Sequence, residues 1–249
     1  MKTLSIFMLS IFLLMGCKQA KTSGETTTAE KVSAAQEQTG TTAAAETTPA
    51  TVDTTFTFDN CETGKNPDGW TEGFTGRGTG TKWGVADDNG NKVLAQLSKD
   101  NPSYHFNVIA YNPLELKNVE MVVRLKGVTG KEDQGGGFVW RFKDFNNYYV
   151  VRANPLEDNV VLYKVVEGKR SDLPLVGKGR TYGMKVKPLG NGWNTLKLTV
   201  KDDLFTVYLN GKELFQVKDD TFTDAGKIGL WTKADAVTYF DDLRVKEIK

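Results

Sequence analysis

Short alternating apolar runs, separated by turn-forming residues, are the feature of this sequence that most restricts its fold. From Phe56 onward, β-branched and aromatic residues recur at every second position in short stretches, and Gly, Asn and Asp separate these stretches. A period of two places successive side chains on opposite faces of a strand, and many such strands are typical of a sandwich or barrel. The sequence therefore predicts an all-β domain over residues 56–249, with a single helical turn or loop at 219–224.

Two tight turns predict how three of these strands connect. Asn210 and Gly211 stand between the runs 204–209 and 212–217, and both residues tolerate the positive φ that a two-residue hairpin requires. Asp202-Asp203 links the run that precedes it to 204–209 in the same way. We therefore expect an antiparallel meander of three strands in this part of the chain.

The first residues have the pattern of an export signal. Lys2 supplies a positive charge, and residues 4–15 form an apolar run that is shorter than the roughly 20 residues of a membrane span but suits a signal peptide. The run ends in Leu14-Met15-Gly16-Cys17, which resembles the lipobox of bacterial lipoproteins. That resemblance implies cleavage after residue 16 and acylation of Cys17, which gives a stable membrane anchor. An ordinary signal peptide with an incidental cysteine is the alternative.

Residues 17–55 are expected to be a lipid-anchored linker. After Cys17 this segment is rich in Thr, Ala and Glu and contains no aromatic residue, so it cannot bury enough apolar surface to offset the entropy of ordering. A Thr-rich, O-glycosylated stalk is the alternative. The expected location is the bacterial cell envelope, either periplasmic or at the cell surface.

Charge and cysteine content exclude some classes of function. Lys and Arg number 32 and Asp and Glu 31, for a net charge of +1, so electrostatic capture of nucleic acid is not expected. The two cysteines provide neither a zinc cluster nor a disulfide framework in the folded part. Cys17 and Cys61 are able to pair, but acylation of Cys17 is the preferred interpretation and leaves Cys61 as an unpaired, inert thiol.

Four motifs in the C-terminal half carry a family resemblance. They are Trp193–Leu198, Phe205–Lys212, Gly226–Trp231 and Tyr239–Val245. In this order they resemble concanavalin A-like (laminin-G-like) jelly rolls, and the domain is similar over 56–249 to the bacterial 3-keto-disaccharide hydrolase family, which is grouped with family-sixteen glycoside hydrolases. The resemblance implies a two-sheet antiparallel jelly-roll sandwich that meets ligands on its concave face. Because this fold hosts lectins, enzymes and scaffolds alike, it does not by itself fix the function.

Catalytic residues are hard to identify. Family-sixteen enzymes carry a Glu-x-Asp-x-x-Glu motif, which this sequence lacks, and retaining glycosidases need two carboxylates about 5–5.5 Å apart. An enzyme acting on oxidised sugars still needs an acid or base, for which Glu157 and Arg152 are the candidates. Glu132-Asp133 lacks a third carboxylate, and His105, the only histidine, is expected to be structural.

The stretch 135–164 suggests a ligand-binding surface. Strand alternation places Tyr148, Arg152 and Asn154 on one face, and we expect Arg141 of the preceding strand to lie beside Arg152. Adjacent arginines repel unless an anion offsets them, which favours an acidic or oxidised sugar as ligand, since aromatic rings stack on sugars and Arg and Asn bond hydroxyls. Salt bridges to Glu or Asp are the alternative. The expected binding residues are Trp140, Arg141, Tyr148, Arg152, Asn154, Lys164 and Trp231.

A structural calcium ion is a further hypothesis. Asp59 and the pair Asp241-Asp242 supply oxygen ligands near the first and last strands, although charges that protect an edge strand explain them equally. The leading functional hypothesis is a membrane-anchored lipoprotein whose sandwich binds carbohydrate. The alternatives are a hydrolase or lyase acting on 3-keto-disaccharides and a structural or protein-binding module of the envelope.

Overall fold

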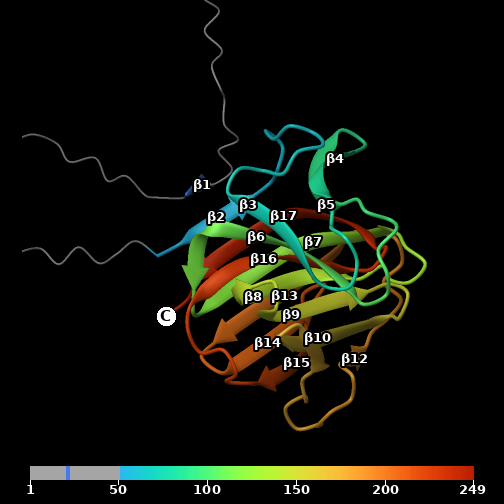
Figure 1. Cartoon of the computed structure of the whole chain (residues 1–249). Coiled ribbons are helices and arrows are strands. Elements are labelled where there is room, and N and C mark those ends of the chain that lie inside the picture. Colours follow the sequence, from blue (N-terminus) through green and yellow to red (C-terminus); the bar gives the residue numbers. More distant parts are fainter. Residues whose placement is uncertain (1–20, 23–50) are drawn as a thin grey trace, which may run out of the picture.

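Two antiparallel sheets stacked face to face form the fold (Figure 1). The structure is a computed structural model that describes residues 21–22 and 51–249. The predicted all-β sandwich is confirmed, and no helix capable of crossing a bilayer occurs in these ranges. Of the helical turn or loop expected at 219–224, the structure has the loop. That segment is an irregular loop, in which the Thr221 N–H donates to the Asp219 side chain at 2.9 Å.

The first sheet, sheet A, contains both the first and the last described strands of the chain. Its main path runs β1 (Lys21–Thr22), β2 (Asp53–Phe56), β17 (Val237–Glu247), β7 (Val119–Thr129), β13 (Asn194–Lys201), β14 (Leu204–Leu209) and β15 (Lys212–Lys218). In addition, β5 (Asn91–Gln96) pairs with β17 and with β4 (Trp83–Asp88).

The second sheet, sheet B, carries the segment in which the sequence indicated a ligand surface. Its main path runs β11 (Lys169–Asp172), β10 (Asn159–Val166), β9 (Asn147–Asn154), β8 (Gly136–Asp144), β16 (Gly226–Lys233), β6 (His105–Leu116) and β3 (Trp70–Gly76). A short strand, β12 (Met184–Lys185), pairs with the start of β10.

The meander at the edge of sheet A has the predicted connections. The β14–β15 turn places Asn210 at φ 49° and Gly211 at φ 80°, the left-handed conformation that the Asn-Gly pair favours. Asp202, between β13 and β14, adopts φ 51°. Strand β2 begins at Asp53, ahead of Phe56, because Thr54 and Phe56 continue the alternating pattern and point into the core.

The core between the sheets follows the period-two pattern. On β13, Leu196, Leu198 and Val200 are fully buried, whereas the residues between them are partly exposed. Facing them from sheet B, the Trp140 ring lies 5.3 Å from that of Tyr149. This interior is continuous across both sheets and fixes which residues of β8 and β9 face inward.

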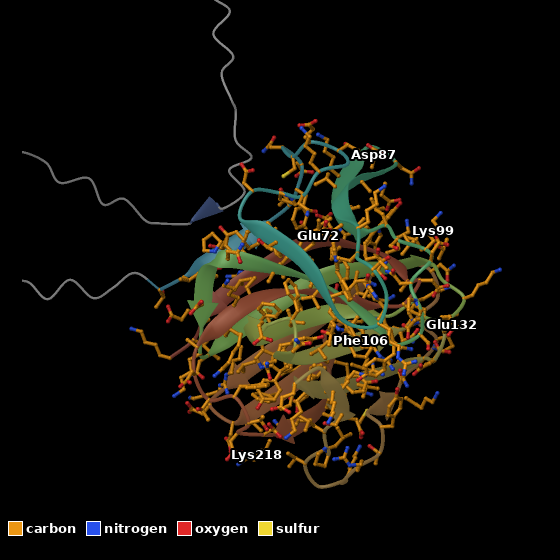
Figure 2. All side chains as sticks on the ribbon, in the orientation of Figure 1. Glu72, Asp87, Lys99, Phe106, Glu132 and Lys218 are labelled. Carbon is orange, nitrogen blue, oxygen red and sulfur yellow. The ribbon has the colours of Figure 1, made fainter. Side chains whose placement is uncertain are left out.

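The opposite face of sheet B is also largely buried. Its middle carries a second apolar cluster that includes Phe106, Val150 and Trp231, and Phe106 lies near the centre of the view in Figure 2, with Glu132 at the margin. The Arg170 guanidinium covers this cluster at 4.6 Å from the Phe106 ring centre. Strands β8 and β9 are therefore apolar on both faces, and polar side chains gather at one end of the sheet instead.

The predicted leader and lipid anchor are not covered by the described residues. The signal peptide at 1–16, Cys17 and the linker residues 18–20 and 23–50 lie outside them. Cys61 is within them, and it is buried and has no free thiol. The expectation that Cys61 is unpaired is therefore wrong.

Candidate functional site

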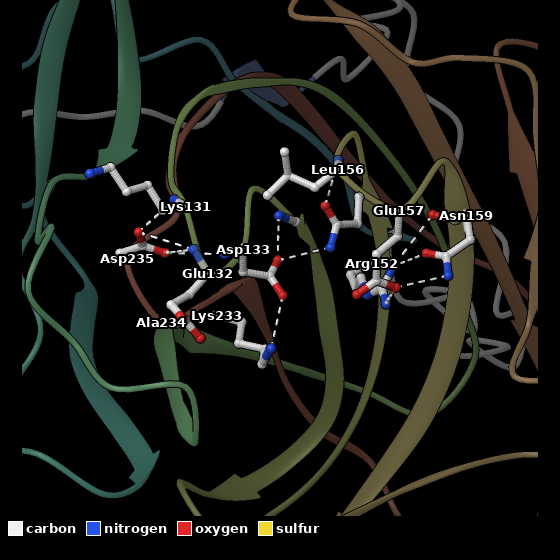
Figure 3. A network of polar contacts seen from close by, with 12 residues as sticks. Lys131, Glu132, Asp133, Arg152, Leu156, Glu157, Asn159, Lys233, Ala234 and Asp235 are labelled. Carbon is white, nitrogen blue, oxygen red and sulfur yellow. Dashed lines mark hydrogen bonds and ion pairs between the residues drawn. The ribbon is translucent and has the colours of Figure 1, made fainter.

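Six polar side chains gather at the end of sheet B where β9 turns into β10 (Figure 3). We call them the polar cluster: Asp133, Arg152, Asn154, Glu157, Asn159 and Lys233. They come from β9, the β9–β10 turn, β10, β16 and the loop that precedes β8. Segments far apart in sequence thus contribute to one site.

An ion pair between Arg152 and Glu157 forms one half of the cluster. Arg152 Nη2 donates to Glu157 Oε2 at 2.8 Å and to the Tyr163 hydroxyl at 3.1 Å, and Nη1 donates to Asn159 Oδ1. The Arg152 side chain is only 2% exposed, whereas that of Glu157 is 37% exposed. Arg152 therefore binds one carboxylate oxygen of Glu157 from the protein interior, and the carboxylate remains accessible to solvent.

The surroundings of Glu157 keep its carboxylate ionised. Burial by itself would raise the pKa of Glu157, but the charge of Arg152 and hydrogen bonds from Asn159 and Arg152 outweigh burial, so the pKa lies below its ordinary value. The charge of Lys233 acts in the same direction. At neutral pH the site thus presents a negative acceptor next to buried positive charge.

Asp133 organises the other half of the cluster. Its Oδ2 accepts from Lys233 Nζ at 3.1 Å, and its Oδ1 accepts from the Gly135 N–H at 2.7 Å and from Asn154 Nδ2 at 3.2 Å. A Cβ on Gly135 would lie 2.8 Å from Asp133 Oδ1 and 3.2 Å from Arg152 Cδ. The glycine-rich start of β8 is therefore what allows these side chains to pack together.

Hydrogen bonds to Asp235 hold the loop that carries Asp133 in place. Its carboxylate accepts from the backbone N–H groups of Lys131, Glu132 and Asp133 at 2.6, 3.1 and 3.1 Å. A carboxylate that bonds consecutive backbone donors holds a loop in one conformation. Asp133 is therefore pre-positioned, which favours a binding site over a mobile loop.

An exposed aromatic ring borders the cluster. Tyr182 is 47% exposed, its hydroxyl lies 3.0 Å from that of Tyr163, and Tyr163 in turn contacts Arg152. Tyr182 has φ 55°, an unfavourable conformation for a bulky residue that nonetheless presents the ring at the surface. Tyr182 is not among the residues expected from the sequence, although an aromatic residue in a short polar loop closed by Gly183 is a signal for an exposed contact residue.

Of the residues expected from sequence, the structure brings Arg152, Asn154 and Glu157 together. Arg141 lies elsewhere, since the residue opposite Arg152 on β8 is Gly137. Arg141 occupies a bulge with φ 45°, and its guanidinium donates to the backbone carbonyls of Lys117, Asp202 and Phe222. The expected pair of adjacent arginines is not found.

Lys164 and Tyr148 are also separate from the cluster. Lys164 pairs with Tyr149 in the sheet, which places it on the face opposite Arg152, and its Nζ lies 2.8 Å from Asp219 Oδ2. Tyr148 is fully buried, with its hydroxyl 2.8 Å from Thr75 Oγ1. Tyr148 does share a face of β9 with Arg152, as strand alternation predicts. However, neither Tyr148 nor Lys164 contacts Arg152.

The two predicted tryptophans offer no ring face to a ligand. Trp140 lies between the sheets against Tyr149 and Phe205. Trp231 is fully buried on the other face, 5.9 Å from the Arg170 guanidinium. Both rings therefore stabilise the fold.

His105 and the predicted calcium ligands have structural contacts. His105 is fully buried and stacks on Phe74 at 4.5 Å. Asp241 Oδ2 accepts from Asn91 at 2.9 Å, Asp242 pairs with Arg124 at 3.0 Å, and Asp59 is exposed. In the ranges 21–22 and 51–249, no group of three His, Cys, Asp or Glu residues is arranged to hold a metal.

Comparison with solved structures identifies relatives of the fold. The carbohydrate binding module CBM66 from Bacillus subtilis aligns with a TM-score of 0.53 and 22% identity, covering 72% of this chain and 96% of the module. The GH43 protein BlXynB from Bacillus licheniformis aligns with a TM-score of 0.51 and 14% identity, covering 77% of this chain and 38% of that protein. At these identities the likeness confirms the jelly-roll sandwich and no more.

Sequence comparison identifies the family. No curated protein matches the chain. The model of the 3-keto-alpha-glucoside-1,2-lyase-like domain matches residues 54–246, which include the whole polar cluster and nearly all of both sheets. The resemblance found in the C-terminal motifs is thus confirmed, and the protein belongs to the family of 3-keto-alpha-glucoside-1,2-lyase-like domains.

Proposed function

We propose that the domain binds carbohydrate at the polar cluster, with 3-keto-glucosides as the ligand class. The observation that carries this proposal is the ion pair between the buried Arg152 and the partly exposed Glu157. The pair orients a solvent-facing carboxylate beside Lys233 and near the exposed ring of Tyr182. Glu157 accepts from sugar hydroxyls, and Lys233 donates to a keto or hydroxyl oxygen. Tyr182 packs against the C–H face of the sugar ring.

The proposed site occupies only one end of sheet B, whereas the sequence suggested the whole concave face. The middle of the outer face of sheet B is filled by the apolar cluster under Arg170, so a sugar has no polar partners there. Family membership supports an oxidised glucoside as the ligand, since members are named for that substrate.

A second candidate function is elimination from such a glucoside, and the solvent-accessible carboxylate of Glu157, with the Lys233 charge near it, favours this function. A 3-keto group acidifies the proton on C2, so a carboxylate can remove that proton. The electron pair of the C2–H bond first forms an enolate, whose charge Lys233 stabilises, and then forms the C1–C2 double bond as the C1–O bond breaks. The departing oxygen takes up a proton. No oxidant or reductant is needed.

The binding proposal is tested by titrating the purified protein with a 3-keto-α-glucoside and with its unoxidised parent. We expect tighter binding of the keto sugar and a loss of about tenfold in Glu157→Gln and in Lys233→Met, because each removes a charged hydrogen-bonding partner. Lys164→Met is the matched control, because Lys164 is also ion-paired but lies on the other face of the sheet. Equal effects of the Lys233 and Lys164 substitutions would contradict the proposal.

Elimination is tested separately with a 3-keto-α-glucoside that carries deuterium at C2. Turnover should release the label into water, and Glu157→Gln should abolish that release while the fold is retained. Retention of the label by the wild-type protein over prolonged incubation, with the sugar bound, would leave binding as the function and rule out elimination.

We also propose that the mature protein is a lipoprotein of the bacterial cell envelope. The positive start, the short apolar run and Leu14-Met15-Gly16-Cys17 support this proposal. The chain contains two cysteines, so a thioether at Cys17 and a disulfide between Cys17 and Cys61 are alternative fates of the same sulfur atom.

A further inference from the structure

We infer that a second ligand site, which we call the lysine groove, takes the acidic part of a glycan. The groove has a volume of about 510 Å³, within the range of small-molecule sites. One wall is the segment 184–189, which starts at β12, and the other is the β14–β15 hairpin. It lies between β12, which pairs with β10 of sheet B, and the β14–β15 hairpin of sheet A.

The floor of the groove is apolar and rigid. Leu189 and Leu209 are 8% and 7% exposed and belong to the core between the sheets. Met184, Val186 and Leu214 are partly buried and pack against that core. C–H-rich ligand faces gain from contact with such a floor, because apolar area leaves water.

The rim of the groove is positively charged. Lys185, Lys187 and Lys212 line it, and none of the described residues that line it carries a carboxylate. Among the ion pairs of the described chain, none involves Lys187 or Lys212. Three ammonium groups around one apolar floor repel one another, so an anionic ligand is favoured.

The groove shares a wall with the polar cluster. Lys185 Nζ donates to the Glu157 carbonyl at 2.7 Å, the Val186 N–H donates to the Asp158 carbonyl at 2.9 Å, and the Leu189 N–H donates to Asp158 Oδ1 at 3.1 Å. A saccharide held by Glu157 therefore reaches the groove by crossing this turn. This step rests on the proposed function and identifies the occupant as a saccharide that bears carboxylates, such as uronic acids.

The test uses oligogalacturonate and a neutral oligosaccharide of equal length as probes of the purified protein. We expect the acidic chain to bind more tightly, and the double variant Lys187→Gln/Lys212→Gln to weaken its binding by about tenfold. Both side chains are exposed, so the fold should be retained. The double variant Lys99→Gln/Lys201→Gln removes the same charge from exposed sites elsewhere and should leave binding unchanged.

The outcomes separate this inference from the proposed function. If the 3-keto-glucoside binds but the acidic chain binds no better than the neutral one, the lysine groove inference is overturned and the polar cluster stands. Equal losses in the two double variants overturn it as well, since general electrostatic attraction then explains the binding. Displacement of the acidic chain by vesicles of anionic lipid, with equal sensitivity to Lys187→Gln/Lys212→Gln, would assign the groove to a membrane surface instead. Loss of binding to both sugars in Glu157→Gln, with the groove intact, supports the shared path.

Discussion

Arg152 lies on β9, Glu157 stands five residues later in the β9–β10 turn, and their side chains meet at 2.8 Å. One partner is buried and the other reaches solvent, so the pair joins the interior of the sheet to its surface. A buried guanidinium needs such a partner, because an uncompensated charge in the interior is costly. The relationship makes the turn both a structural element and the candidate site.

A fall in pH should weaken the Arg152–Glu157 ion pair and so lower the stability of the fold. The pKa of Glu157 is lowered in the folded protein, so its stabilising contribution is complete above the ordinary pKa of a glutamate and disappears as the pH falls through the folded-state value. We expect wild type to lose stability on acidification more steeply than Glu157→Gln, with the two curves converging at the acid end. Urea unfolding across this pH range measures the difference, and parallel curves would contradict the assignment.

The ring of Tyr182 should contribute to sugar binding without supporting the fold. Tyr182→Ala removes an exposed stacking surface, worth about 1 kcal/mol, or roughly fivefold in affinity, while Tyr182→Phe keeps it. Tyr104→Ala is the control, because Tyr104 is also exposed but lies away from the polar cluster. In calorimetric titration with the 3-keto-glucoside, only Tyr182→Ala should show reduced affinity, whereas Tyr182→Phe and Tyr104→Ala should bind like wild type.

Gly135 should tolerate no side chain. In Gly135→Ala the new methyl group would lie 2.8 Å from Asp133 Oδ1, so Asp133 must move and its bonds to Asn154 and Gly135 weaken. We expect a loss of about 1–3 kcal/mol in unfolding free energy together with weaker sugar binding. Gly192→Ala, where no atom lies within 4 Å of the added Cβ, is the neutral control. Equal stabilities of the two variants would show that the packing around Asp133 is loose.

Arg141 should matter for the fold and not for the ligand. Its guanidinium donates to three backbone carbonyls, and Arg141→Met would leave these acceptors without a donor at a cost of about 1–3 kcal/mol each. The exposed Arg180→Met serves as the comparison. Chemical denaturation should show a large loss for the first variant only, and the folded fraction should bind sugar normally. Weaker sugar binding by the folded fraction would contradict this prediction and show that Arg141 contributes to the binding site.

The fate of Cys17 can be read from the mass of the mature protein. A lipoprotein begins at Cys17 and carries diacylglycerol and an N-linked acyl chain, which add a fixed mass and partition the protein into detergent. Cys17→Ser should abolish both properties. A mature protein with an intact intrachain disulfide and no acyl mass would instead assign Cys17 to Cys61 and remove the anchor.

Local pattern was sufficient for the sandwich and for part of the site. Period-two alternation identified the inward residues of β13 and the partners of Arg152 on β9, and turn chemistry identified the Asn210-Gly211 hairpin. Arg152, Asn154 and Glu157 lie within one hairpin, so a local argument could bring them together. Lys164 lies on the other face, because it stands three residues after Val161, the sheet partner of Arg152, and an odd spacing along a strand reverses the face.

The other residues of the polar cluster come together through contacts between distant parts of the chain, which a local sequence pattern does not predict. Lys233 meets Asp133 although 100 residues separate them, because β16 lies next to β8 in the sheet. Arg141 leaves the expected face because a bulge shifts the register of β8 against β9. Between Trp140 and Asp144, β8 has two more residues than the facing part of β9. Extra residues of this kind redirect the nearby side chains, and nothing in the adjacent sequence predicts them.

A crystal structure of the protein with a 3-keto-α-glucoside bound tests the central claim most directly. We predict that the sugar lies at the end of sheet B, with a hydroxyl on the Glu157 carboxylate, an oxygen on Lys233 and its C–H face against Tyr182. A sugar bound at any other surface, with the Arg152–Glu157 turn empty, would contradict it.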